Sequence, residues 1–549
     1  MAGNPPQSAE EAEFRAAIQA VVSSPSGKKL VIGGPGTGKT MLFRQLLKHT
    51  RGDPDQRLVL TFINNLKDDL QDALGSLAKV FTLHSYCLGL LYRDSSLRGS
   101  LSPNFRCCPG LASIIAEDWE LITQSDTPKF LGEMRALSAE NQIPFYLARG
   151  EYYDAVDFDD TVYRAYKGLS SGRATPASYS LILIDEYQDF NALEAGVIDA
   201  LAEHSPILIA GDDDQALYSQ LRDASWDHIR LLSKAGEYEV FKLPFCMRCP
   251  KVIVDAVNDI LTKAEESERL KGRIKKPYKH FPPSKGADST KYPKIAHVET
   301  SVQRQDANYM GRYLAQVIAQ IPADEIKTAK RDGYPAALVI VAKPYRDQIV
   351  SHLEGAGYVV DTRRDSDTKL AREAGLLILK VDRVSNLGWR IVLGADAPSF
   401  LKDAVVATAD GTKRLIEVLP DEYCKRVLAE VDAYETPEEV ETDAQAHAPT
   451  EIPTVKVTVF EGAKGLSAQH VYIAGLHNGE LPHDPTSIKD LEICKFVVGL
   501  TRTRKKCTLI HTRNFVGNWK SPSSFISWIN SARLEDVKVD AQYWKAHPD

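Results

Sequence analysis

Residues 31–40 constrain the fold more strongly than any other part of this sequence. They are V-I-G-G-P-G-T-G-K-T and match the phosphate-binding pattern G-x-x-x-x-G-K-[ST]. An apolar run, residues 29–32, precedes the pattern and predicts a buried strand, while residues 41–48 have the spacing of an amphipathic helix. A strand, a glycine-rich loop and a helix in this order predict an α/β domain whose loop binds phosphate groups.

The residue types in this loop each have an expected role. Glycines allow backbone N–H groups to surround phosphates. Lys39 should reach the β- and γ-phosphates, and Thr40 should be a ligand of Mg²⁺. The predicted nucleotide-binding residues of the loop are Gly33, Gly34, Pro35, Gly36, Thr37, Gly38, Lys39 and Thr40. ATP with Mg²⁺ is therefore the expected cofactor pair, and a chance glycine-rich turn is the alternative.

Length and composition limit the class of protein. The chain has 549 residues, too many for one hydrophobic core, so roughly three or four domains or subdomains are expected. Its net charge of -7 gives no overall basic character, so any nucleic acid must bind in a local groove. No apolar run approaches membrane-spanning length, and we expect no membrane partner. The 8 scattered cysteines suggest reduced thiols, which favours a cytoplasmic location.

Cysteines at C-x-x-C spacing occur once, at Cys246 and Cys249. A structural zinc site normally needs four ligands, supplied by a second cysteine pair or by histidines at similar spacing. No such second pair or histidine cluster lies nearby in the sequence. We therefore interpret the spacing of these two residues as a coincidence.

Acidic residues follow two further apolar runs. Residues 179–184 predict a strand that ends in Asp185 and Glu186. Asp185 could hold Mg²⁺ through water, and Glu186 could polarise the attacking water. A solvated acidic turn is the alternative, which the presence of the phosphate loop disfavours. Residues 206–210 predict another strand, after which Gln215 is placed to sense the terminal phosphate.

Two other stretches differ in character from this α/β pattern. Residues 90–175 show helical periodicity with mixed charge and predict a helical insertion. Residues 263–294 contain many lysines together with proline, glycine and tyrosine. A solvated loop is the default interpretation of that run, and a contact with the backbone of duplex DNA is the alternative.

The order of the motifs resembles the UvrD/Rep/PcrA family of superfamily 1 helicases. T-F-I-N, T-L-H-S-Y, D-E-Y-Q-D and G-D-D-D-Q-A-L-Y follow the phosphate loop, and then comes an arginine that precedes a helix. Residues 462–466 (G-A-K-G-L) are similar to the family's fifth motif, and residues 496–504 (F-V-V-G-L-T-R-T-R) to its sixth. The ordered set extends from residue 33 to residue 504, which makes the resemblance highly specific.

This resemblance implies an α/β protein with two RecA-like motor domains, each built on a parallel sheet, and a nucleotide bound between them. The implied parts are domain 1A (1–90 and 175–243), a helical insertion 1B (91–174), domain 2A (244–365 and 452–540), a reduced 2B-like insertion with linker (366–451) and a tail (541–549). The family's 2B subdomain is large and mobile. Here its place is short and contains a linker-like run, residues 436–453.

The resemblance also implies roles for individual residues. Arg248 and Arg502 would come from domain 2A and neutralise the charge that develops on the transferred phosphate. Gly465 would join the nucleotide-binding residues, and Thr40 and Asp185 would hold the metal ion. The implied catalytic residues are Lys39, Glu186, Gln215, Arg248 and Arg502.

In this family a single DNA strand lies across both motor domains, and the protein moves along it from 3′ to 5′. Side chains at the ends of the second and third strands of domain 1A would contact the DNA, as donors to phosphates or as stacking faces for bases. The implied nucleic-acid-binding residues are Thr61, Phe62, Asn64, His84 and Tyr86. Single-stranded or partly duplex DNA is therefore the expected partner.

Four positions that contact the base or the sugar in the family are altered here. The region of Phe14 and Arg15 lacks the usual glutamine, and Met41 stands where an arginine usually follows the phosphate loop. Met247 replaces the stacking aromatic residue, and Ser467 replaces the glutamate that binds the ribose. The phosphate-binding positions are intact. These changes predict normal phosphate chemistry with a relaxed choice of nucleobase.

Two further differences from the family's motifs concern residues that would contact DNA. The family's third motif has a tryptophan where this chain has Gln220, and the histidine of the fifth motif is replaced by Glu461. An acidic side chain would repel a passing phosphate. Hydrolysis is therefore better supported by the sequence than processive unwinding.

Two classes of function follow from these features. The first is a DNA translocase or helicase that works in DNA repair, recombination or phage defence, with a nuclease or repair protein as a possible partner. The second is an ATPase switch that DNA or a protein partner triggers, with little or no unwinding. The intact Gln215 and Arg502 favour the first class, and the short 2B region, Gln220 and Glu461 favour the second.

Overall fold

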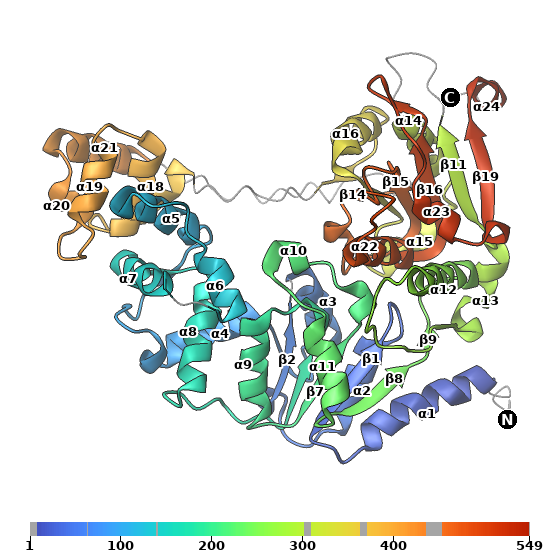
Figure 1. The fold of residues 1–549 in the computed structure, drawn as a ribbon, viewed down its shortest axis with the longest axis horizontal. Helices are drawn as coiled ribbons and strands as arrows, with labels where there is room; N and C mark the ends of the chain where they lie inside the picture. Colours follow the sequence, from blue (N-terminus) through green and yellow to red (C-terminus); the bar gives the residue numbers. More distant parts are fainter. Residues whose placement is uncertain are drawn as a thin grey trace.

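Two α/β domains and a helical lobe make up the molecule in the computed structural model (Figure 1). The structure describes residues 8–62, 64–138, 141–300, 309–362, 371–434 and 453–547. Within these ranges, no helix is long and apolar enough to cross a membrane. The predicted α/β class with two large parallel sheets is confirmed.

The first sheet has six parallel strands in the order β3-β2-β6-β7-β1-β8. Its strands are β1 (Lys28–Gly33), β2 (Arg57–Thr61), β3 (Lys79–Thr82), β6 (Leu181–Ile184), β7 (Ile207–Gly211) and β8 (Glu239–Leu243). Both faces are covered by helices, which explains why the strands are continuous apolar runs. In β1, for example, Val31 packs into one core, whereas Leu30 and Ile32 pack into the core on the opposite face.

Helices of domain 1A cover the two faces of this sheet. α1 (Ala9–Ser23), α2 (Lys39–His49) and α3 (Asn64–Leu74) contribute to one core, and α4 (Leu83–Arg93), α9 (Ala192–Ala202) and α11 (Asp227–Ala235) contribute to the other. α2 begins directly after the phosphate loop. Its N-terminus therefore points at the carboxyl edge of the sheet, where β6 and β7 also end.

The second sheet has seven parallel strands in the order β13-β14-β12-β15-β16-β11-β19. Its strands are β11 (Ile295–Thr300), β12 (Ala337–Val341), β13 (Val360–Asp361), β14 (Val455–Thr458), β15 (Ala468–Ala474), β16 (Thr503–Thr512) and β19 (Leu534–Val539). α12 (Lys251–Glu266), α22 (Asp490–Thr501) and α23 (Ser524–Trp528) share a core on one face. α14 (Tyr309–Ala319) and α16 (Arg346–Gly355) share the core on the other face.

The predicted tail at 541–549 is a helix in its described part. α24 (Ala541–Ala546) packs Tyr543 and Trp544 against the same core as α14 and α16. Its N-cap is Asp540, whose carboxylate accepts hydrogen bonds from the backbone N–H groups of residues 542 and 543. The sequence prediction missed this helix because only two aromatic side chains anchor it.

A helical lobe lies beside domain 1A (Figure 1). The segment 91–174 supplies α5 (Leu111–Thr123), α6 (Phe130–Ala136), α7 (Ile143–Tyr153), α8 (Phe158–Ser170) and the two-residue strands β4 (Arg106–Cys107) and β5 (Ala155–Val156). The reduced 2B-like region supplies α17 (Arg372–Val381), α18 (Asn386–Asp396), α19 (Leu401–Ala407), α20 (Leu415–Val418) and α21 (Asp421–Ala433). The two groups share one hydrophobic core. Nearly all of the predicted linker-like run 436–453 lies outside the described residues.

A buried carboxylate joins the two groups of helices. Asp118 of α5 is fully buried and lies 2.6 Å from a guanidinium nitrogen of Arg149 in α7 and 2.8 Å from that of Arg390 in α18. Arg390 is 1% exposed, so each cation depends on this carboxylate for charge compensation. The 2B-like helices are thus held to 1B by a buried, shared ion pair as well as by apolar packing.

Replacing Asp118 by alanine should destabilise the lobe by about 3–5 kcal/mol, because it leaves two buried guanidinium groups without their carboxylate. Calorimetry of the purified chain should show a lower first melting transition. The control is Glu117→Ala, which removes the exposed neighbour that also pairs with Arg390 and should cost less than about 1 kcal/mol. Equal effects of the two substitutions would show that the buried carboxylate does not hold the lobe together.

Candidate nucleotide site

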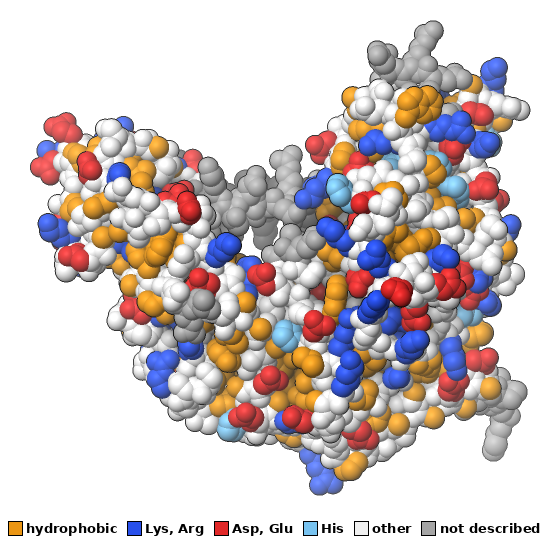
Figure 2. Space-filling view, in the orientation of Figure 1, with side chains coloured by type: hydrophobic (Ala, Val, Ile, Leu, Met, Phe, Trp, Pro, Cys, Tyr) orange, Lys and Arg blue, Asp and Glu red, His pale blue; other side chains and the backbone are white. Residues whose placement is uncertain are grey.

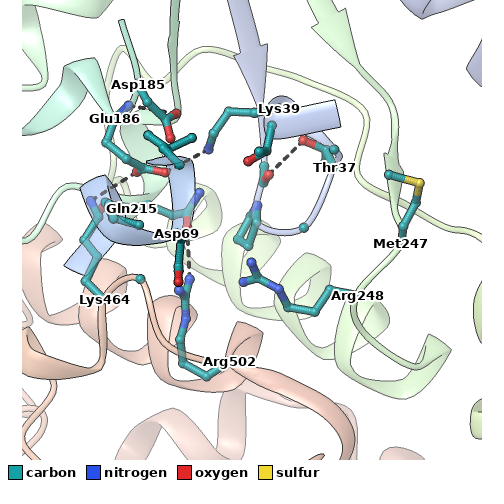
Figure 3. A pocket seen from close by; sticks show the side chains of 18 of the residues that line it. Thr37, Lys39, Asp69, Asp185, Glu186, Gln215, Met247, Arg248, Lys464 and Arg502 are labelled. Atoms are coloured by element: carbon teal, nitrogen blue, oxygen red, sulfur yellow. Dashed lines mark hydrogen bonds and ion pairs between the residues drawn. The ribbon is translucent and has the colours of Figure 1, made fainter. Parts of the chain in front are cut away.

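A cavity of about 300 Å³ opens between the two α/β domains (Figure 3). Residues from both domains form its wall, and most of the predicted site residues are among them. The lining residues are Gly34, Pro35, Gly36, Thr37, Gly38, Lys39, Thr40, Leu66, Asp69, Leu70, Asp185, Glu186, Gln215, Met247, Arg248, Lys464, Gly465, Arg502 and Arg504. Of the predicted phosphate-loop residues, only Gly33 does not line the cavity.

The phosphate loop needs glycine at two of its positions. Gly36 and Gly38 have φ angles of +69° and +88°, which side-chain-bearing residues rarely adopt. A Cβ atom on Gly36 would lie 2.5 Å from the Cβ of Arg248, and one on Gly38 would lie 2.5 Å from the Cε of Met247. Domain 2A therefore approaches this loop so closely that only glycine fits.

Lys39 lies at the start of α2 and faces the acidic end of the cavity. Its Nζ is 3.1 Å from the carboxylate of Glu186 and 3.5 Å from the carbonyl oxygen of Gly33. Burial lowers the pKa of Lys39, but the carboxylates of Glu186 and Asp185 outweigh that effect and hold the pKa above its usual value. The ammonium group therefore remains charged where the phosphates of a nucleotide would lie.

The two carboxylates after β6 have different environments. Burial and the neighbouring charge of Glu186 raise the pKa of Asp185 to about 7. Burial also opposes ionisation of Glu186, but Lys39 and Lys464 outweigh it and hold its pKa below the usual range. Glu186 has a φ angle of +55°, a strained conformation that turns its side chain toward Lys39 and Gln188.

Thr40 and Asp185 both line the cavity, and their side-chain oxygens are ligand types that suit Mg²⁺.

The second domain contributes cations to the same cavity. An N–H group of Arg502 donates a hydrogen bond to Oε1 of Gln215 at 3.2 Å, and Arg248 donates to the carbonyl oxygen of Thr501 at 3.4 Å. Burial and the nearby charge of Arg248 lower the pKa of Arg502 to about 10. Both guanidinium groups lie on the wall opposite the acidic residues (Figure 3), where an anion would compensate their charge.

Lys464 is the main site residue that the sequence prediction left out. Its ammonium group contacts the carboxylate of Asp189, lies 3.5 Å from Glu186 and donates to the carbonyl oxygen of Gln215 at 2.8 Å. The sequence did contain the information needed to predict it, because Lys464 lies within the G-A-K-G-L run that resembles the family's fifth motif. Asp69 of α3 also lines the cavity, but an acidic residue on an otherwise ordinary amphipathic helix gives no sequence signal.

The side chains closest to Gly38 are apolar. Met247, Phe14 and Met41 place their terminal carbons within 4 Å of the position that a Cβ on this glycine would take. Ser467, at the altered sugar position, accepts a hydrogen bond from Arg504 at 2.9 Å. These three apolar residues offer a surface for packing but no hydrogen-bonding group for the edge of a base.

Four of the five predicted DNA-binding residues have described side chains, and these four are buried instead of exposed. Thr61, Phe62, His84 and Tyr86 are 0%, 4%, 9% and 2% exposed, respectively. Arg222 covers two of them, with its guanidinium group 4.8 Å from the centre of the Phe62 ring and 2.9 Å from a ring nitrogen of His84. The side chain of Asn64, like that of Gln220, lies outside the described part of the structure. The four described side chains therefore form no exposed track for a DNA strand in this conformation.

Two other sequence interpretations can be compared with the structure. Cys246 and Cys249 are both buried, and within the described ranges no third metal-ligating side chain joins them to form a candidate metal site. The lysine-rich run 263–294 is not a solvated loop throughout, because Lys276 is buried among carboxylates. Glu461, which replaces the family's histidine, lies 2.6 Å from Lys495.

Comparison with known proteins agrees with this geometry. A family model described as an AAA domain matches residues 15–220. The ATP-dependent DNA helicase PcrA of Bacillus subtilis is 26% identical over 288 residues, which cover 44% of this chain and 38% of PcrA. A probable DNA helicase II homolog of Mycoplasma pneumoniae is 22% identical over 652 residues, covering 97% of this chain and 88% of that protein. The chain is thus similar to DNA helicases of the UvrD-like group within superfamily 1.

Other relatives match only part of the chain. The ATP-dependent DNA helicase Rep of Buchnera aphidicola is 23% identical over 279 residues, covering 43% of each protein. The chain spans about two fifths of the length of the PcrA proteins that it matches.

His84 should make the stability of this chain depend on pH. Burial and Arg222 lower its pKa to about 3, so below pH 6.5 the unfolded chain binds a proton that the folded chain excludes. Stability is therefore lost as the pH falls from about 6.5 toward 3, by at most about 1.4 kcal/mol per pH unit. Relative to wild type, a His84→Gln variant should gain stability as the pH falls from 7.5 to 5.5, measured by its melting temperature.

Glu194, which lies beside His84, has the opposite effect on the pH dependence of stability. Burial raises its pKa to about 7, so the folded chain holds a proton there that the unfolded chain releases above about pH 4.5. Glu194 contributes to the pH dependence of both wild type and the His84→Gln variant. The difference in stability between these two proteins therefore reports on His84. The same substitution at exposed His204 is the control. A pH-independent difference between His84→Gln and wild type would contradict the buried, neutral imidazole.

Proposed function

We propose that this chain is a nucleoside triphosphatase that couples hydrolysis to movement along single-stranded DNA. The observation that carries the proposal is the composition of the cavity. Lys39 and Glu186 of one domain and Arg502 of the other face a single space that can hold a triphosphate. A site divided in this way is complete only when the two domains approach each other, and so it links hydrolysis to domain motion.

Each group at the site has a part in phosphoryl transfer. The N–H groups of the loop and Lys39 would hold the β- and γ-phosphates. Thr40 and Asp185 would hold Mg²⁺, which when bound neutralises part of the phosphate charge. Glu186, ionised beside Lys39, would orient and polarise the attacking water, and Gln215 would contact the terminal phosphate.

Arg248 and Arg502 would stabilise the charge that develops on the transferred phosphate. Arginine suits this role because its guanidinium group remains charged and presents several N–H donors in one plane. Arg502 already contacts Gln215, so it lies next to the group that would meet the terminal phosphate. After hydrolysis the anion that held the arginines in place would be smaller, and the domains could separate.

DNA as the substrate is supported by the family, because the relatives that match this chain are named as DNA helicases. Resemblance to that family further suggests movement from 3′ to 5′, a cytoplasmic location, and work in repair, recombination or phage defence beside a nuclease or repair protein. On the face shown in Figure 2, basic and acidic side chains are interspersed rather than separated. A DNA strand would therefore bind a local track and not a broad basic surface.

An ATPase switch with little or no unwinding is the second candidate. Burial of Phe62 and His84 beneath Arg222 favours it, because these residues would have to be uncovered before they could contact DNA. Glu461, which pairs with Lys495, also places a carboxylate near the end of β14, where it would repel a passing phosphate of DNA. In this alternative, DNA or a protein partner triggers hydrolysis and the chain regulates an associated nuclease or repair complex.

Steady-state hydrolysis, measured with and without single-stranded DNA, tests the motor against a switch that responds only to a protein partner. A motor should hydrolyse ATP at least about tenfold faster with DNA, and Lys39→Ala should abolish the activity because the phosphates lose their buried cation. Lys48→Ala, an exposed position on the same helix, is the matched control. Hydrolysis that DNA does not change would contradict the motor and leave the switch.

The same assay with GTP, CTP and UTP tests the choice of base. The apolar surroundings of Met247 and Phe14 predict that the specificity constants differ by less than about tenfold. Strict preference for ATP would contradict relaxed base choice without affecting the proposal of a triphosphatase.

A further inference from the structure

Three consecutive carboxylates lie buried behind the nucleotide cavity. Residues 212–214 are at most 2% exposed, and within the described ranges they are the only group with the spacing to hold a metal ion. Basic side chains occupy the positions around them. Lys276 lies 2.6 Å from Asp212 and 2.6 Å from Asp214, while Arg230 lies 2.8 Å from Asp213. The acidic run is therefore compensated by cations of the chain itself.

Lys276 reaches this position from the segment between α12 and α13 (Pro282–Lys291). Its side chain is 3% exposed, whereas that of the adjacent Lys275 is 78% exposed. Two residues further on, the hydroxyl of Tyr278 donates a hydrogen bond to the carbonyl oxygen of Pro35 at 3.1 Å. The segment thus contacts both the phosphate loop and the acidic run.

Hydrogen bonds connect Lys276 to the predicted phosphate sensor. Oδ1 of Asp212 lies 2.6 Å from the ammonium group of Lys276, and its Oδ2 accepts a hydrogen bond from Nε2 of Gln215 at 2.7 Å. Oε1 of Gln215 in turn accepts from Arg502 at 3.2 Å. Because Asp212 can only accept from the amide nitrogen, it determines which end of the amide faces the guanidinium group.

The position of Asp212 depends on Lys276 for physical reasons. Asp212 is fully buried, and a buried carboxylate needs compensating partners to stay in place. Without the ammonium group of Lys276, the carboxylate would move and leave the amide nitrogen of Gln215 without its acceptor. Lys276 also lies 3.6 Å from Asp213 and 2.6 Å from Asp214, so the loss of this one cation affects the whole run.

We propose that Lys276 is a positioning residue for hydrolysis: by holding the carboxylate of Asp212 in place, it orients the Gln215 amide between Arg502 and the terminal phosphate. This inference rests on the proposed triphosphatase activity and deepens it. Lys276 touches neither the nucleotide cavity wall nor Arg502, so its effect must pass through Asp212 and Gln215.

A purely structural ion pair is the competing explanation, and kinetics distinguish the two. A residue that orients the sensor affects the chemical step and should lower kcat while leaving KM for ATP nearly unchanged. Lys276→Met should lower kcat by at least about tenfold, as the loss of a group behind a reacting residue commonly does. The number of nucleotide sites per chain, titrated with a fluorescent ADP analogue, should remain that of wild type.

Controls and a double-mutant cycle complete the experiment. Lys275→Met removes the exposed neighbouring ammonium group and should leave kcat unchanged. Asp212→Asn removes the charge that Lys276 compensates but keeps an oxygen that can accept from Gln215. If Lys276 acts through Asp212, Lys276→Met should cost less in the Asp212→Asn background than in wild type.

The following results would overturn the inference. The first is hydrolysis of ATP by Lys276→Met at the wild-type rate, and the second is a loss of activity that equals the loss of nucleotide sites. The third is an effect of Lys276→Met that is as large in the Asp212→Asn background as in wild type. If the wild-type chain hydrolyses ATP in the same assay, any of these results overturns the role of Lys276 but leaves the proposed triphosphatase activity in place. A wild-type chain that binds but does not hydrolyse any nucleoside triphosphate contradicts both.

Discussion

The contact of Lys464 with Asp189 and Glu186 is the interaction on which the site depends. All three side chains are buried or nearly so, and the lysine comes from the second domain whereas both carboxylates come from the first. Buried carboxylates need a cation, and breaking such a pair costs several kcal/mol. Within the described part of the first domain, the cation that pairs with Glu186 is Lys39. Closure of the cleft and completion of the acidic end of the site are therefore the same event.

Residue patterns within short segments predicted much of the structure. The phosphate loop, β6 with Asp185 and Glu186, and β7 with Gln215 could be located because an apolar run followed by polar residues marks the carboxyl end of a buried strand. The family resemblance added Arg248 and Arg502, and both side chains line the cavity. Each of these predictions depended on a few adjacent residues and on their order along the chain.

Long-range contacts account for what the sequence could not predict. Lys276 is separated by about sixty residues from the carboxylates that it contacts, and a lysine-rich run gives no sign of which member will be buried. Arg222 lies against both Phe62 and His84, although it is far from them in the sequence. Packing of the 2B-like helices on 1B depends on Asp118 and Arg390, which are far apart in the sequence. Tertiary packing decided each case, and local propensity did not.

The structure thus supports the proposed nucleotide chemistry more directly than the proposed contact with DNA. The groups around the phosphates converge on one cavity, while the groups expected to meet DNA are covered. A central claim follows: Arg502 of the second domain is needed for the chemical step more than for binding the nucleotide. Arg502 tests this most directly, because it lies on the far wall and contacts Gln215.

The decisive measurement is single-turnover hydrolysis by Arg502→Ala, with nucleotide affinity measured in parallel. Our account predicts that the affinity changes by no more than a few fold, whereas the rate of the chemical step falls by about 10³ or more. An unchanged rate would mean that the first domain alone contains the complete site, and it would contradict the division of the site between the two domains.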